Sequence, residues 1–202
     1  MEFDLDALSQ RDRYKLLTAL VVPRPIAWVT TRNADGSVNA APYSFFNLMG
    51  TAPPVVAFGP DDASGVKDTP RNVRETGRFV VNLVDEATAP AMHASSAPYP
   101  AGESEAEALG LALADVPWGD VPRIADAPAA LVCREHATHL IGKTRVVLGV
   151  VEGLWVRDAL VDPERHRVDQ AARRAVGRLG GGLYSTVEFL DLGPRPRLDD
   201  GA

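Results

Sequence analysis

The sequence predicts one mainly β domain with α-helical additions, spanning residues 1–202 and folded as an antiparallel barrel or sandwich. Three observations favour this class: six or so runs rich in β-branched and apolar residues, connections mostly too short for crossover helices, and helical patterns confined to the edges. A length of 202 residues also suits one domain better than two. A doubly wound α/β fold is the weaker alternative, because parallel strands need long crossover connections.

The chain is expected to begin with a helix that ends before the first strand. Ser9 can cap this helix, because a serine oxygen accepts hydrogen bonds from the free N–H groups of the first turn. Tyr14, Leu17 and Leu20 recur at the spacing of one helical face. Pro23 cannot continue a helix and is expected to follow its end.

Strands are expected wherever apolar and β-branched residues run together. The runs with this signal are 26–31, 38–43, 55–58, 79–84, 130–140, 144–156 and a last short one at 184–189. Asp35-Gly36 lies between the first two runs and predicts a hairpin turn, and a second hairpin is expected near Gly142-Lys143. The tail 194–202 is expected to be disordered.

Two further helices are expected between the strands. The first covers about 70–76, with Thr69 as its N-cap and Pro70 at its first helical position. The second lies at 103–109, inside a segment, 85–126, that is rich in Ala, Pro and acidic residues and has few strand signals. This segment is therefore interpreted as a helical or looped insertion.

Composition excludes several classes of protein. The 21 Lys and Arg against 27 Asp and Glu give a net charge of −6, which disfavours non-specific binding to nucleic acid or to an anionic membrane. Cys133 is the single cysteine, so no internal disulfide can form, and its apolar run favours burial over a nucleophilic role. The acidic N-terminus lacks the pattern of a signal peptide, and no apolar run reaches the roughly 20 residues of a membrane span. We therefore expect a cytoplasmic protein.

The familiar catalytic motifs are missing from the sequence. It has no glycine fingerprint for a dinucleotide, no P-loop, no nucleophile elbow and no zinc-protease helix motif. His136 and His139 stand three residues apart in an expected strand, which places them on opposite faces and disfavours a shared metal. No catalytic side chain and no metal ligand are therefore predicted.

One polar segment has the composition of a phosphate site. Lys67, Asp68 and Thr69 precede the helix expected at 70–76, and Asn72 lies in its first turn. A lysine and a hydroxyl beside the free N–H groups of a helix N-terminus are the usual means of binding a phosphate. An ordinary capped helix at the surface explains the same residues, and the segment alone does not decide between the two.

A second segment has small residues on a strand followed by polar ones. Ala40, Ala41 and Pro42 precede Ser44 and Asn47. Small side chains would allow a flat ring to lie against the backbone. An edge strand that leaves the sheet at Pro42 is the alternative explanation.

Taken in order, several segments resemble one protein family. They are Val21 to Thr31, Asp35 to Asn47, Pro53-Pro54, Lys67-Asp68-Thr69 with Asn72, Phe79 to Leu83, and, near the C-terminus, Arg178 to Tyr184. Together they resemble the flavin reductase-like family of FMN-binding split β-barrels, to which flavoredoxin belongs. The match is dense over about residues 14–85 and thinner afterwards.

The resemblance implies a homodimer of split barrels in which each subunit binds one FMN near the interface. Thr30, Thr31 and the stretch Ala41, Pro42, Tyr43 and Ser44 would contact the ring and the ribityl chain. Asn47 would lie toward the ribityl-phosphate end, Lys67, Asp68, Thr69 and Asn72 would surround the phosphate, and Arg24 and Arg178 would supply charge near the phosphate or the opposing subunit.

The resemblance also implies a function. The chain would be an FMN-dependent oxidoreductase that passes electrons from NAD(P)H or a redox protein through bound FMN to a small acceptor. The alternatives are a flavin reductase that uses free flavin as its substrate, a flavoredoxin-like electron carrier, and a barrel that only stores or senses a ligand. Where related flavin reductases have Gly-Asp-His, this chain has Gly142-Lys143-Thr144, so the resemblance does not carry over an assisting histidine.

Overall fold

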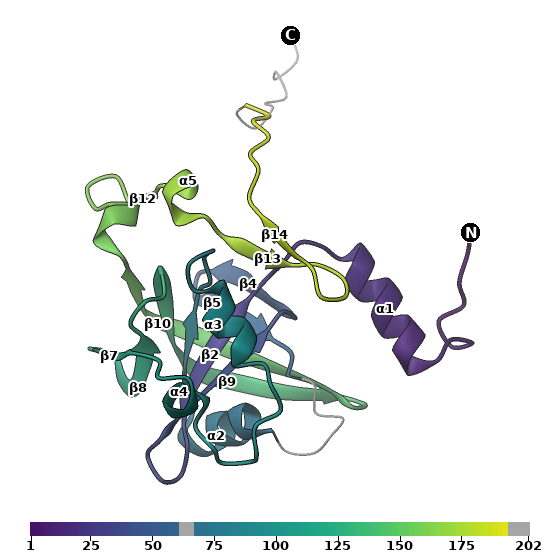
Figure 1. The fold of residues 1–202 in the computed structure, drawn as a ribbon, viewed down its shortest axis with the longest axis horizontal. Helices are drawn as coiled ribbons and strands as arrows, with labels where there is room; N and C mark the ends of the chain where they lie inside the picture. The colour runs from purple at the N-terminus through teal and green to yellow at the C-terminus, as the bar shows by residue number, and fades with distance from the viewer. Residues whose placement is uncertain (61–66, 194–202) are drawn as a thin grey trace.

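A seven-stranded antiparallel sheet dominates the structure, a computed structural model that describes residues 1–60 and 67–193 (Figure 1). The strand order is β3-β2-β6-β9-β10-β5-β4. The strands are β2 (Ala27–Arg32), β3 (Val38–Tyr43), β4 (Phe46–Thr51), β5 (Pro54–Phe58), β6 (Arg78–Asn82), β9 (Ala129–Ile141) and β10 (Thr144–Val156). The predicted mainly β, antiparallel class is confirmed. The tail 194–202, expected to be disordered, lies outside the described residues.

The sheet curls into a barrel that is split between its two edge strands. β3 and β4 are the first and last strands of the order, yet only Ser44 and Phe45 connect them. Because consecutive Cα atoms are about 3.8 Å apart, the ends of the two strands lie within about 11 Å of each other. The edges must therefore approach one another, and β3 ends at the split.

Smaller elements surround this barrel. The helices are α1 (Gln10–Leu20), α2 (Asp68–Thr76), α3 (Ala89–Ala94), α4 (Glu105–Ala108), a 3-10 turn (Asp158–Leu160) and α5 (Gln170–Arg173). The remaining strands are β1 (Arg24–Pro25), β13 (Val176–Arg178) and β14 (Tyr184–Thr186) in one sheet, β7 (Leu113–Val116) with β8 (Gly119–Ile124), and β11 (Val161–Asp162) with β12 (Arg167–Val168). No helix within 1–60 and 67–193 is both long and apolar enough to cross a membrane.

Both hairpin predictions are confirmed. β2 pairs with β3 across a turn in which Gly36 has φ +87°, and β9 pairs with β10 across a turn in which Gly142 has φ +60°. Both glycines adopt the left-handed backbone conformation that side chains with a Cβ disfavour. The burial of Cys133 is also confirmed, and burial raises the pKa of its thiol.

Four sequence predictions of local structure were wrong or incomplete. β4 was not expected, and the insertion 85–126 contains α3 and the β7–β8 hairpin besides α4. The last strand ends at Thr186 rather than at 189. Helix α2 begins at Asp68, so its N-cap position is Lys67 and not Thr69. Thr69 lies in the first helical turn, and its hydroxyl accepts a hydrogen bond in the protein interior instead of capping the helix.

The N-terminal helix α1 forms as predicted but does not join the core. Ser9 caps it, since the hydroxyl oxygen accepts a 3.1 Å hydrogen bond from the N–H of Asp12. Its apolar residues stay exposed, Leu20 by 75%, and α1 stands apart from the sheet in Figure 1. Within α1 only Thr18 is buried.

The barrel interior holds the main apolar core. It contains Phe58 and Phe79, whose ring centroids are 5.4 Å apart, and Val73 of α2 closes the core from outside the sheet. A second cluster on the other face of β2 contains Trp28 and Met92. β2 is therefore buried on both faces, which agrees with the burial of its first five residues, Ala27 to Thr31.

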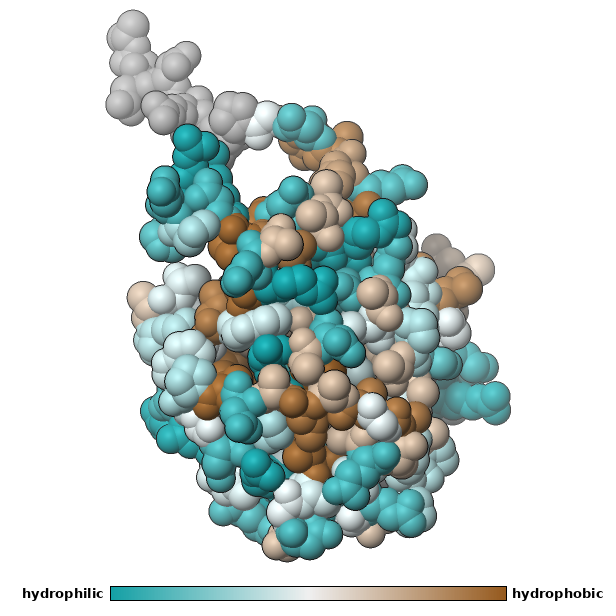
Figure 2. Space-filling model, turned by 60° about the vertical axis from the view of Figure 1, so that its left-hand side comes forward, coloured by the Kyte–Doolittle hydropathy of each residue, from teal (hydrophilic) through white to brown (hydrophobic). Residues whose placement is uncertain are grey.

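Figure 2 turns the left-hand side of Figure 1 forward and shows apolar side chains in separate patches with polar surface between them. Leu113 and Trp118 of the β7–β8 hairpin and Leu154 of β10 are exposed. The indole of Trp118 lies directly over Gly153 of β10, where a Cβ would collide with it. An aromatic ring thus covers a glycine in the sheet on this side.

We expect Gly149→Ala to lower the free energy of unfolding by about 1–3 kcal/mol, the usual range for overpacking a core. Gly149 lies in β10 against the buried ring of Phe79, and an added Cβ would come within 2.9 Å of Cε1. Urea unfolding monitored by circular dichroism measures the loss. Gly182→Ala is the control, because a Cβ there meets nothing within 4 Å. Equal stability of the two variants would contradict the tight contact.

Candidate functional site

A pocket of about 520 Å³ lies where β3, the N-terminus of α2 and the segment from Ser95 to Glu105 meet. Six residues predicted to bind the cofactor line it: Ala41, Pro42, Tyr43, Lys67, Asp68 and Thr69. We call it the Lys67 pocket. The fold therefore brings the two polar segments singled out in the sequence together around one cavity, whose volume suits a small-molecule ligand.

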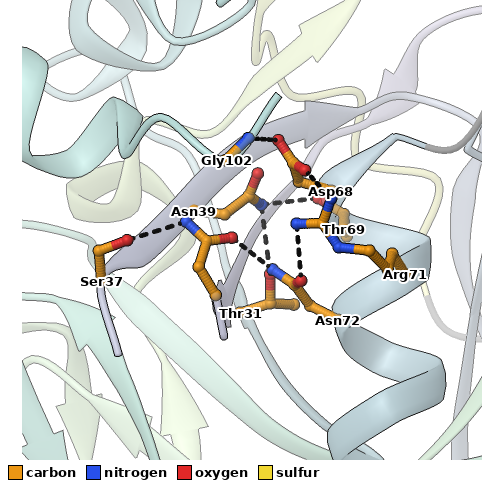
Figure 3. A network of polar contacts seen from close by, with 9 residues as sticks. Thr31, Ser37, Asn39, Asp68, Thr69, Arg71, Asn72 and Gly102 are labelled. Atoms are coloured by element: carbon orange, nitrogen blue, oxygen red, sulfur yellow. Dashed lines mark hydrogen bonds and ion pairs between the residues drawn. The ribbon is translucent and has the colours of Figure 1, made fainter. Parts of the chain in front are cut away.

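A buried network of polar side chains forms the base of this pocket (Figure 3). Asn39 Nδ2 donates to Thr69 Oγ1 at 2.7 Å and to Thr31 Oγ1 at 3.3 Å. Asn72 Nδ2 donates to the same Thr31 oxygen at 3.0 Å and to Asn33 Oδ1 at 2.8 Å. The network joins β2, β3 and α2, so it holds the start of α2 against the sheet.

The network also changes the interpretation of three predicted site residues. Thr31, Thr69 and Asn72 are at most 1% exposed. In the interior, Thr31 accepts from Asn72 and Asn39, and Thr69 accepts from Asn39. The Thr31 and Asn72 side chains are not among those that line the pocket. Thr31 and Asn72 thus lie behind the pocket wall, where Thr31 holds the side chain of Asn39, which lines the pocket.

The charge of Asp68 is balanced within the protein. Its Oδ1 lies 2.6 Å from Nη1 of Arg71, and its Oδ2 accepts a 3.0 Å hydrogen bond from the N–H of Gly102. Asp68 thereby ties α2 to the loop before α4. Lys67 next to it is exposed and makes no capping hydrogen bond through its side chain. Lys67 and the helix N-terminus contribute positive charge at this end of the pocket.

A second carboxylate, Glu105 of α4, lines the pocket and was not predicted. It is 7% exposed, and its Oε2 accepts a 2.9 Å hydrogen bond from the N–H of Ala40. Burial raises the pKa of Glu105, and the bond from Ala40 opposes this rise. Burial also raises the pKa of the neighbouring Tyr43 hydroxyl, which contacts Thr69. Glu105 therefore binds α4 to the edge strand β3 at a cost in desolvation.

Glu105→Gln is expected to make the stability less dependent on pH. Since the pKa of Glu105 is raised in the folded state, its ionisation destabilises the fold at neutral pH, and this cost disappears as the pH falls below the ordinary value of 4.5. The Gln amide keeps an acceptor for the Ala40 N–H. We expect the variant to gain stability over the parent at pH 7 and to lose that gain near pH 4, measured by urea unfolding.

Glu103→Gln serves as the control for this comparison, because Glu103 is an exposed carboxylate in the same segment. It is measured at the same pH values, and we expect no comparable gain in stability at pH 7. A Glu105→Gln variant that is less stable than the parent at pH 7 would show that the ionised form is favoured by the fold.

Two other predicted residues have side chains committed to the interior. Thr30 is fully buried and donates to the carbonyl oxygen of Pro122 at 2.8 Å. Arg24 is 6% exposed, and its Nη1 donates to the carbonyl oxygens of Thr18 and Val21 at 2.5 and 2.8 Å. Burial lowers the pKa of Arg24. Arg24 thus ties the end of α1 to the barrel.

The remaining predicted residues line two neighbouring hollows. Arg178 and Ser44 line a pocket of about 170 Å³, called here the Arg178 pocket, which shares Pro42 with the Lys67 pocket. Asn47 lines an apolar groove of about 420 Å³, which shares Ser44 with the Arg178 pocket. The candidate residues therefore follow the split between β3 and β4 rather than one cavity.

The sequence did not predict the wall opposite β3. It is formed by Ser95, Ser96, Ala97, Pro98, Tyr99, Ala101 and Glu105. These residues run from the end of α3 to Glu105, the first residue of α4, in the segment interpreted only as an insertion. The serines and prolines are typical of a loop, and nothing in their pattern indicates that the loop folds back over β3.

Comparison with known proteins agrees with this architecture. Residues 19–171 match the model of the flavin reductase like domain. An uncharacterized protein of Deinococcus radiodurans is 54% identical over 200 residues, covering 95% of this chain and 88% of that protein.

Solved structures give the same result. The 2-nitrobenzoate 2-nitroreductase of Pseudomonas fluorescens superposes with a TM-score of 0.91 at 36% identity, and all of both chains is covered. A putative flavin reductase with a split barrel domain from Shewanella frigidimarina superposes with a TM-score of 0.84 at 23% identity, covering 97% of this chain and 100% of that one. The second likeness shows the fold alone, and it agrees with the barrel split between β3 and β4.

Proposed function

The chain belongs to the flavin reductase like family, and from this premise we propose that it is an FMN-dependent oxidoreductase. Electrons would pass from NAD(P)H or a redox protein through bound FMN to a small acceptor. The observation that carries the proposal is the Lys67 pocket, where an exposed lysine and a helix N-terminus lie at one end of a strand with small residues. The 36% identity to an enzyme named as a nitroreductase, over the whole chain, favours an enzyme over a carrier.

The residues present suit an FMN molecule. Lys67 and the first turn of α2 would hold the phosphate, because the helix N-terminus and the ammonium group both attract an anion. Ala41 and Pro42 leave room for a flat ring against β3, and Pro42 and Ser96 connect the Lys67 pocket to the Arg178 pocket. When bound, FMN supplies the acceptance and donation of hydride at its ring. The side chains need only orient the ring, hold the phosphate and limit access of water.

The test is the absorption spectrum of the purified protein, with the released cofactor identified by mass. We expect flavin bands and the mass of FMN, retained through gel filtration, and oxidation of NADH or NADPH under steady-state conditions. Retention without oxidation of either nucleotide would favour a carrier reduced by a protein. A protein that neither retains FMN nor binds it when it is added would refute the proposal.

We also propose that the protein is a homodimer, because α1 and the edge strand β4 share one exposed apolar surface. The ring centroids of Tyr14 and Phe45 are 6.5 Å apart. Along the chain after Phe45, Leu48 and Met49 of β4 are each more than half exposed. An unpaired edge strand beside an apolar helix invites a second copy of the same surface. Such a dimer would cover the split at which the pockets open.

Light scattering is expected to give about twice the chain mass of 21.6 kDa. Leu17→Glu combined with Leu20→Glu should shift the protein to a monomer, since both leucines are exposed on α1. Leu113→Glu is the control, because that leucine is exposed on the separate β7–β8 hairpin. A parent that is monomeric at micromolar concentration would contradict the proposed interface.

A further inference from the structure

The Arg178 pocket contains an unusual concentration of polar groups for its size. Within about 170 Å³ it is lined by Arg178, His93, Tyr184, Ser44 and Ser96, together with apolar neighbours. No carboxylate lines it among the described residues. Its volume is well below the roughly 300–1,000 Å³ of pockets for drug-sized ligands. The pocket can therefore take only a small molecule or one end of a larger one.

Arg178 is held in this pocket with part of its hydrogen-bonding capacity unused. Its guanidinium carbon lies 4.5 Å from the ring centroid of Tyr184, and Nη2 donates to the carbonyl oxygen of Gly181. Nη1 is buried and has no hydrogen-bond partner among the described residues. Stacking uses the face of the guanidinium and leaves the hydrogen-bonding capacity of Nη1 unused. A buried donor without a partner costs free energy, so a ligand that accepts from it would be stabilised.

The neighbours of Arg178 fix its position. The hydroxyl of Tyr184 lies 3.0 Å from Nδ1 of His93, and the two rings meet edge to face with centroids 5.9 Å apart. This contact ties β14 to α3 and holds the ring on which the guanidinium rests. Arg24 is the register partner of Arg178 across β1 and β13, and it adds a second positive charge beside Ser44.

We propose that the Arg178 pocket binds the carboxylate of a small organic electron acceptor, with Arg178 as the residue that determines specificity. Arginine suits this role because its planar fork matches the two oxygens of a carboxylate. The pocket adjoins the Lys67 pocket at Pro42 and Ser96, so an acid anchored there would extend toward the proposed flavin site. This inference rests on the proposed function in one respect: the ligand is an electron acceptor only if the protein is an FMN-dependent oxidoreductase.

The test compares benzoate with benzamide, its neutral analogue of similar shape. Binding of each to the full chain, with and without added FMN, is measured by calorimetry. The parent is expected to prefer benzoate by tenfold or more, and Arg178→Gln to bind benzoate at least tenfold more weakly with benzamide unchanged. Arg167→Gln, an exposed arginine of β12, is the control and should behave as the parent.

Arg178→Lys covers the case in which the Gln variant does not fold. It keeps the charge but loses the fork, so benzoate should bind more weakly than to the parent while still binding better than benzamide. Equal binding of benzoate and benzamide by the parent would overturn the proposal, as would unchanged benzoate binding in a folded Arg178 variant. Measuring FMN affinity in the same samples separates the two proposals. Benzoate preference without FMN binding would refute the proposed function and the role of the ligand as an electron acceptor, and would leave Arg178 as a carboxylate-binding residue.

Discussion

Ala41→Phe is expected to weaken FMN binding by about a hundredfold or more, which corresponds to roughly 2.7 kcal/mol. Ala41 lies on the edge strand β3 opposite Val29, is partly exposed and lines the Lys67 pocket between Asn39 and Tyr43. A phenyl ring at this position would occupy the space against β3 that the flavin ring needs. The barrel edge remains in place because the backbone pairing of β3 with β2 does not involve the side chain.

The measurement is FMN affinity by quenching of flavin fluorescence, together with the near-ultraviolet circular dichroism spectrum and thermal unfolding of the ligand-free protein. Ala112→Phe, which adds the same ring at an exposed alanine before β7, should bind FMN as the parent does. Ala41→Ser should retain most of the affinity, because it adds one atom. If Ala41→Phe remains yellow with unchanged affinity, the ring does not lie along β3.

The parts of the fold that could be predicted are those in which local signals and tertiary structure agree. Gly36 and Gly142 each mark a turn with a positive φ, and each lies between two runs rich in β-branched residues. Local chemistry alone fixes such a hairpin. The α1 helix was predictable for the same reason, since Ser9 caps it without help from the rest of the chain.

Strand β4 was missed because its residues do not show the pattern of a strand. Every residue of β4 is exposed or only partly buried. Leu48, Met49 and Gly50 do not alternate between apolar and polar residues as a half-buried strand does. It is ordered by pairing with β5 at the sheet edge, which only the tertiary structure supplies. The β7–β8 hairpin is similar, because it is short and Pro122 interrupts its second strand.

The candidate site was predictable as a set of segments but not in its details. The resemblance to the family, added to the chemistry of the two segments, predicted that Lys67 and Ala41 bind the cofactor, and the fold brings them into one pocket. The sequence could not predict which hydroxyl and amide groups would face a ligand. Thr31 and Asn72 could equally hydrogen-bond to a ligand or to each other. The structure pairs them internally at 3.0 Å. The role of Glu105 depended on a loop whose path the sequence does not specify.

Lys67→Gln is expected to weaken FMN binding by about tenfold to a hundredfold while leaving riboflavin binding within about twofold. A charge-assisted hydrogen bond to a phosphate oxygen contributes roughly 1.5–3 kcal/mol, and each 1.4 kcal/mol is about tenfold in affinity. Lys67 is exposed at the N-cap position of α2, and its side chain makes no capping bond, so its loss should leave the ligand-free protein as stable as the parent.

The decisive quantity is the ratio of the two affinities, because riboflavin lacks the phosphate but keeps the ring and the ribityl chain. Lys143→Gln, which removes an exposed lysine from the β9–β10 turn, should leave that ratio unchanged. Thr69→Val is unsuitable as a second test, since it would leave Asn39 Nδ2 without its 2.7 Å acceptor and destabilise the pocket base for both ligands. If Lys67→Gln weakens FMN and riboflavin equally, or neither, Lys67 is an ordinary surface residue of α2 and the phosphate is held elsewhere.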